Sequence, residues 1–90
     1  MEALKNQRAR IDALDDRIVD LLVERFAIVR EVGEIKKAQG IVVVQSHRVE
    51  EVKDRVAARA EAAGLEGSLL KAIYTLLIDH AHVIENKIKG

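Results

Sequence analysis

The sequence predicts an all-α fold of three helices, one very long and two of medium length, in a single domain over residues 1–90. The chain has no proline, the residue that interrupts helices most strongly. Its apolar residues recur at steps of three and four, which is the spacing of one helix face. Glycines, which commonly end helices, separate the apolar stretches.

The first helix is expected over residues 3–38. One glycine inside it, Gly33, costs only about 1 kcal/mol relative to alanine, so the helix should continue to a stop at Gly40. Its apolar stripe consists of Leu4, Ile11, Leu14, Ile18, Leu21, Ile28, Val32 and Ile35.

Residues 41–44, Ile-Val-Val-Val, favour a strand by propensity. A lone strand has no partner to pair with, so we expect an extended connection that packs on the helices. Ser46 is expected to cap the second helix, which should run to about residue 63 and stop at Gly64 and Leu65 in a left-handed turn. Its stripe consists of Val49, Val52, Val56, Ala60 and Ala63.

The third helix is expected over residues 68–87. Its apolar face should consist of Leu69, Ile73, Leu76, Leu77, His80, Val83, Ile84 and Ile88.

The length of the first helix predicts a second subunit. About 36 helical residues form a rod of about 54 Å, whereas a compact chain of this size has a radius of gyration of about 12 Å. The rod must overhang the other helices, and its stripe stays apolar along the whole length. An intertwined homodimer is the simplest closed arrangement that covers it.

Composition excludes several functions. Lys plus Arg and Asp plus Glu number 15 each, with one Phe, one Tyr and no Cys. We therefore expect no nucleic-acid partner, no membrane partner, no metal and no cofactor. The first residues lack the apolar segment of a signal peptide, so the expected location is cytoplasmic.

Three cations lie on the stripe of the first helix: Arg8, Arg25 and Lys36. An unpaired buried cation is costly. Either the three snorkel or pair with internal carboxylates, or they neutralise a bound anion. Arg8 and Arg25 are 17 residues apart, about 25 Å along one rod. They could approach each other only between antiparallel rods of two chains, which predicts two shared sites per dimer.

Glu85 lies on a largely apolar face of the third helix. It could pair with Lys89 at the i,i+4 spacing, or face the cationic cavity. The three histidines, His47, His80 and His82, are expected to be surface or filler residues.

These residues fall into a familiar pattern. The runs RARIDALD at 8–15, LLVER at 21–25 and VGEIK at 32–36, with Arg48 twelve residues after Lys36, resemble the all-helical chorismate mutase family over nearly the whole chain. The resemblance implies an intertwined three-helix homodimer. It also implies an isomerase of aromatic amino acid biosynthesis that converts chorismate to prephenate by a [3,3] Claisen rearrangement.

The resemblance implies a role for each matching residue. Arg25 and Arg48 would bind the dicarboxylate substrate, with Arg8 contributed by the other subunit. Lys36 and Glu85 would be catalytic, because they would stabilise negative charge on the ether oxygen. Glu85 stands where the family has a Gln or Glu.

Three substrate-binding positions depart from the family pattern: Val49 replaces a Glu that contacts the C4 hydroxyl, Ala81 replaces a Ser, and Gln45 replaces an Asp. A valine beside the same Arg also occurs in isochorismate-pyruvate lyases. The alternatives are therefore such a lyase or a homologue that acts on amino-deoxychorismate. A third alternative is a non-catalytic dimerisation module.

Overall fold

The computed structural model describes residues 2–90. A short 3-10 helix, η1 (Glu2–Leu4), leads into α1 (Lys5–Gln39), which is followed by α2 (Ser46–Ala62) and α3 (Gly67–Lys89). The three expected helices are confirmed, and the described residues contain no strand. Residues 41–45 form an irregular connection between α1 and α2, as predicted.

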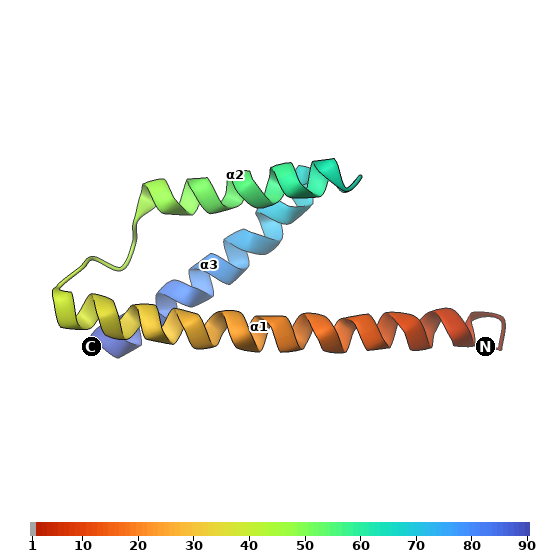
Figure 1. The fold of residues 1–90 in the computed structure, drawn as a ribbon, viewed down its shortest axis with the longest axis horizontal. Coiled ribbons are helices and arrows are strands. Elements are labelled where there is room, and N and C mark those ends of the chain that lie inside the picture. The colour runs from red at the N-terminus through yellow and green to blue at the C-terminus, as the bar shows by residue number, and fades with distance from the viewer. Residues whose placement is uncertain (1) are drawn as a thin grey trace.

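α3 lies between the other two long helices. In Figure 1, the axes of α1 and α2 run in roughly the same direction at a distance from each other, and α3 crosses diagonally between them. Among the described helices, α1 and α2 each contact α3 but not each other. The small apolar core lies mainly between α2 and α3, where the buried residues are Val43, Val52, Val56, Ala57, Ala60, Ile78 and Ala81.

Glycines end the first two helices as the sequence predicted. Gly40 has φ 65°, and Ile41 donates its backbone N–H to the Lys36 carbonyl at 2.9 Å. Gly64 has φ 86°, and Leu65 donates its N–H to the Ala60 carbonyl at 2.9 Å. Positive φ carries little steric penalty for glycine, and these backbone bonds satisfy carbonyls that the helix leaves open.

The beginnings of α2 and α3 differ from the prediction. Gln45 occupies the N-cap of α2, with no side-chain cap hydrogen bond, and Ser46 is the first helical residue. The expected Ser46 cap is therefore wrong, because a capping side chain must come from the residue before the first turn. α3 begins at Gly67, not Ser68, because Glu61 Oε1 accepts the Gly67 N–H at 2.7 Å.

The predicted apolar face of α3 is only partly buried. Ile78, Ala81 and Glu85 form its buried face, while Leu76 is 73% exposed. Three other members of the expected stripe are also exposed, namely Leu69, Ile73 and Val83. α3 packs between two helices, so only part of the expected stripe is covered within the chain: Leu77, Ile84 and Ile88 are half-buried, and Ile88 lies against Gly33 of α1.

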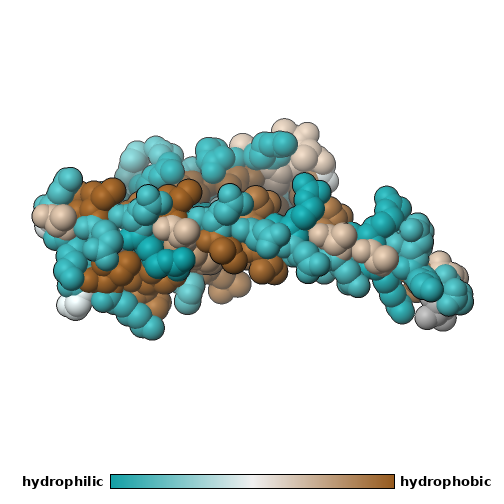
Figure 2. All heavy atoms as spheres, turned by 60° about the horizontal axis from the view of Figure 1, so that its bottom comes forward, coloured by the Kyte–Doolittle hydropathy of each residue, from teal (hydrophilic) through white to brown (hydrophobic). Residues whose placement is uncertain are grey.

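α1 extends far beyond its neighbours. The chain measures 56 × 24 × 14 Å and has a radius of gyration of 16.5 Å, against about 12 Å for a compact chain of this length. Every residue from 2 to 20 is exposed. Figure 2 shows apolar surface on the side of the molecule where the middle and the C-terminal part of α1 lie. Exposed apolar side chains of α1 include Ile11, Leu14, Ile18, Leu21, Ile28 and Ile35.

No helix within residues 2–90 combines the length and the hydropathy that a membrane crossing requires.

Candidate active site

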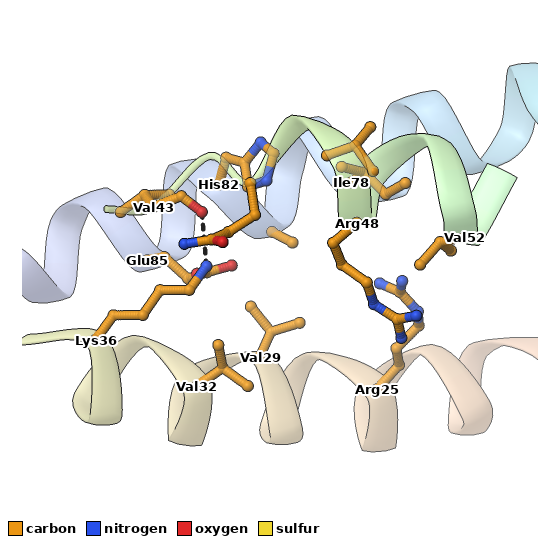
Figure 3. Close-up of a pocket in the computed structure, with 13 residues that line it drawn as sticks. Arg25, Val29, Val32, Lys36, Val43, Arg48, Val52, Ile78, His82 and Glu85 are labelled. Atoms are coloured by element: carbon orange, nitrogen blue, oxygen red, sulfur yellow. Dashed lines mark hydrogen bonds and ion pairs between the residues drawn. The ribbon is translucent and has the colours of Figure 1, made fainter. Parts of the chain in front are cut away.

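A cavity of about 180 Å³ lies between the three helices. α1, α2, α3 and the 41–45 connection all contribute to its wall (Figure 3). Valines from α1 and α2, with Val43 and Ile78, form much of the apolar lining. The sequence-predicted residues that line it are Arg25, Lys36, Gln45, Arg48, Val49, Ala81 and Glu85.

An ion pair joins two helices at one end of the cavity. Lys36 Nζ of α1 lies 2.6 Å from Glu85 Oε1 of α3, and the two side chains are only 13% and 6% exposed. Glu85 Oε1 is buried, and Lys36 is its only partner among the described residues. Lys36 Nζ also donates to the Val43 carbonyl at 2.6 Å.

The alternative pairing of Glu85 with Lys89 is wrong. Lys89 Nζ instead donates to the Ile41 carbonyl at 2.6 Å. The two lysines thus hold the carbonyls of Ile41 and Val43, which fixes the connection that forms one wall of the cavity. Glu85 faces the cationic cavity, as the functional interpretation required.

Gly33 allows α1 and α3 to approach at this pair. A Cβ atom at Gly33 would lie 2.9 Å from Ile88 Cδ1 and 3.4 Å from Glu85 Cα. Gly33 is also the buried residue of α1. The glycine that the sequence treated as a weak point of the helix is therefore a contact point between helices.

Arg25 is held on an aromatic face. Its guanidinium carbon lies 5.4 Å from the centre of the Tyr74 ring, a cation–π geometry worth about 0.5–1 kcal/mol. Its Nη1 atom is buried and has no hydrogen-bond partner within residues 2–90. A buried donor left unsatisfied costs about 1–3 kcal/mol, so this atom favours an anionic ligand.

Arg48 and Gln45 form the more exposed rim. Arg48 Nη1 bonds Glu51 Oε1 at 2.7 Å, an exposed pair that contributes little to stability. Gln45 Nε2 donates to the Val42 carbonyl at 3.1 Å. Val49 and Ala81 contribute apolar lining nearby.

Arg8 lies apart from these residues. It is exposed on the overhanging part of α1, in a shallow hollow that also involves Glu2, Lys5 and Asp12. The 17 residues between Arg8 and Arg25 correspond to about 25 Å along the helix. Within one chain, the two arginines cannot bind the same small molecule.

The sequence interpretation missed His82. It is half-buried and lines the cavity. The available signal was its position three residues before Glu85 and directly after Ala81, because residues at i and i+3 share a helix face. His80, by contrast, packs edge-on against Phe26, with ring centres 5.3 Å apart.

The charged groups of the lining are mainly cationic. Arg25, Lys36 and Arg48 outnumber the single carboxyl group of Glu85 among the described lining residues. The fold and the site thus define an all-helical protein with a small cationic cavity.

Comparison with known proteins identifies the family. The model of the family described as chorismate mutase type II matches residues 7–86. The chain is 26% identical over 87 residues to the chorismate mutase of Methanocaldococcus jannaschii, covering 97% of this chain and 88% of that protein. It is 32% identical over 83 residues to the 4-amino-4-deoxychorismate mutase of Streptomyces venezuelae, covering 92% and 81%.

A further relative is much longer. The T-protein of Haemophilus influenzae is 29% identical over 87 residues, which cover 97% of this chain but only 23% of the T-protein. Because the family model matches residues 7–86, the chain belongs to the chorismate mutase type II family.

Proposed function

We propose that the chain converts chorismate to prephenate. The observation that carries the proposal is the cavity in which the unpartnered Arg25 Nη1 and the Lys36–Glu85 pair lie with Arg48. Chorismate is a dicarboxylate, and the lining supplies cationic groups that can bind carboxylates. Family membership supports the same activity.

The reaction depends more on holding the substrate in the right conformation than on reactive side chains. The ether C–O bond breaks while a C–C bond forms within the same molecule, so no atom enters or leaves. In the proposal, Arg25 binds one carboxylate in a charge-assisted contact and an arginine from a second chain binds the other. Holding the two ends fixes the reactive conformer, and fixed geometry supplies a large part of the rate acceleration.

Lys36 and Glu85 act on the ether oxygen. Negative charge grows on that oxygen as its bond to carbon breaks, and donors aimed at developing charge stabilise the transition state. Lys36 donates from its ammonium group. Glu85 can donate only when protonated, so the proposal requires its acid form in the productive complex.

The second arginine is Arg8 of a partner subunit. All residues from 2 to 20 are exposed, and apolar side chains are spread along α1. A second copy packed antiparallel would cover that stripe and bring its Arg8 toward Arg25. The proposed assembly is a homodimer with two symmetric sites, each built from both chains.

A second candidate substrate follows from Val49. An apolar side chain lines the cavity at the position where the resemblance implies an acid for the C4 hydroxyl. Two relatives, from Streptomyces venezuelae and Streptomyces pristinaespiralis, are named 4-amino-4-deoxychorismate mutase. An isochorismate or amino-substituted substrate is therefore the second candidate.

The test is turnover of chorismate, isochorismate and 4-amino-4-deoxychorismate side by side, followed by absorbance and with each product identified. We expect chorismate to give prephenate at the highest kcat/KM. Release of pyruvate from isochorismate as the preferred reaction would favour the lyase, and no turnover of any substrate would contradict the proposal.

A further inference from the structure

The cavity contains few groups that can accept a hydrogen bond. The side chains of Arg25, Lys36 and Arg48 are donors only. The Val43 carbonyl already accepts from Lys36 at 2.6 Å. Glu85 is paired with Lys36, and the proposed mechanism assigns its carboxyl to the ether oxygen.

The proposed substrate also carries a hydroxyl group, which must donate its proton to an acceptor. Leaving that hydroxyl unsatisfied once the substrate is buried would be costly. Val49 and Ala81 offer no polar atom. The side-chain acceptors that remain among the described lining residues are Gln45 and His82.

His82 is the better placed of the two. Gln45 is exposed at the rim, and the bond from its Nε2 to the Val42 carbonyl ties its side chain to the 41–45 connection. His82 is half-buried on α3, and no hydrogen bond or ion pair occupies its ring within residues 2–90. Figure 3 shows it across the cavity from α1, on the same helix as Glu85.

His82 is also close to Val49. Both residues, with Ile78, line the cavity on one side and a second hollow between α2 and α3 on the other. The imidazole therefore lies beside the position where an acidic side chain would otherwise meet the hydroxyl. A neutral imidazole accepts a hydrogen bond through one ring nitrogen, and partial burial strengthens such a bond.

We propose that His82 accepts the hydrogen bond of the substrate hydroxyl and so determines the selectivity of this site for a hydroxyl-bearing dicarboxylate. The inference rests on the proposed function and adds to it a residue that touches the substrate. It also explains how the site can use chorismate when Val49 supplies no polar contact.

The experiment compares two substrates that differ at one position: chorismate and its analogue with hydrogen in place of the hydroxyl. Values of kcat/KM for both are measured with the wild type, His82→Phe and His82→Gln. His82→Phe keeps a ring but has no acceptor, whereas the Gln side chain retains one. If His82→Phe fails to fold, His82→Val makes the same comparison.

We expect His82→Phe to lower kcat/KM for chorismate by about threefold to tenfold, the range that one lost hydrogen bond produces. Turnover of the deoxy analogue should stay within about twofold, because the analogue never made the bond. His82→Gln should restore most of the selectivity. The matched control is His80→Phe on the same helix, which should leave the ratio of the two substrates unchanged.

Equal losses on both substrates would overturn the inference, because they would indicate a purely structural role. Selectivity that is unchanged in His82→Phe but lost in Gln45→Leu would assign the hydroxyl to Gln45 and also overturn it. No turnover of chorismate by the wild type would overturn the proposed function and this inference together. Turnover with an unchanged ratio would overturn this inference alone.

Discussion

Glu85 is a carboxyl group in a place where the proposed reaction needs a donor. It is 5% exposed and lies against Lys36. As a carboxylate it would repel the negative charge that develops on the ether oxygen, and it has no proton to donate. The presence of a hydrogen-bond donor at this position should therefore control the rate.

Replacing Glu85 with Gln tests that control. The amide is a permanent donor of similar size. Glu85→Gln should therefore keep most of the wild-type kcat/KM or exceed it, whereas Glu85→Ala, which has no donor, should lower kcat/KM by about tenfold to a hundredfold. The measurement is kcat/KM for chorismate with the three proteins at one pH. Equal losses in Glu85→Gln and Glu85→Ala would contradict a role for Glu85 as a donor to the ether oxygen.

Val49 gives a second test of a single residue. Val49→Glu offers the C4 hydroxyl a charged acceptor in place of the neutral His82 imidazole, and a hydrogen bond to a charged group is stronger than one to a neutral group by about 1 kcal/mol. The ratio of kcat/KM for chorismate over isochorismate should rise by about twofold to tenfold. Val49→Gln serves as an uncharged comparison. A ratio that stays constant or falls would show that residue 49 does not meet the hydroxyl.

Sequence reasoning found most of the cavity because polar residues on apolar helix faces are conspicuous. Arg25, Lys36 and Glu85 interrupt stripes that are otherwise apolar, and all three line the cavity. The Lys36–Glu85 contact itself was not predicted, because it depends on how two helices pack. His82 was missed because all three histidines were treated as surface or filler residues, without regard to the face that His82 shares with Glu85.

Among the helices, the contact between α1 and α3 has the most direct effect on the cavity. Gly33 lets Ile88 and Glu85 approach α1 closely, and Lys36 lies one turn further along α1. A larger side chain at residue 33 would push α3 outward and separate Lys36 from Glu85.

Gly33→Val should therefore lower both stability and activity. Overpacking a close contact costs about 1–3 kcal/mol, and kcat should fall more than KM rises because the separated pair acts in the transition state. Gly33→Ala is the control: its gain in helix propensity offsets a contact with the flexible end of Ile88. Melting temperature and kinetics are measured at equal protein concentration. A Gly33→Val protein as stable and active as the wild type would contradict this account of the contact.

Helix boundaries were predictable where glycine decides them. Gly40 and Gly64 both end helices with positive φ. Helix starts were less predictable, because the Gly67 N–H is satisfied by Glu61 from the preceding helix. The apolar face of α3 was predicted only in part. Periodicity locates an apolar stripe, but it does not say which part of the stripe contacts a neighbouring helix of the same chain.

The whole chain is an elongated body with a large exposed apolar surface on α1. The buried core is small, and chains of this size usually need further stabilisation from a disulfide, a metal or a partner subunit. The sequence predicted this shape from the length of α1 alone. The partner that covers the stripe is inferred from the same observation.

Sedimentation equilibrium at micromolar concentration should give about twice the monomer mass. Placing a charge on the stripe, as in Leu14→Glu, should dissociate the dimer and lower its melting temperature, because it buries an unpaired carboxylate. The matched control is Asp16→Glu on the same exposed segment. A well-folded wild-type monomer at this concentration would contradict the proposed assembly.

The most direct test of the central claim, a chorismate-converting site shared by two chains, uses two inactive variants. Arg8→Ala and Arg25→Ala are each expected to lose most activity. Mixed and reassembled in equal amounts, about half of the dimers should be heterodimers. In each heterodimer one site carries both arginines and the other neither.

Chorismate turnover of the mixture should therefore recover to about a quarter of the wild-type value, since half of the dimers each hold one intact site out of two. Heterodimer formation is checked by mass spectrometry of differently tagged chains. Turnover no higher than that of either variant alone, with heterodimers present, would contradict the shared site.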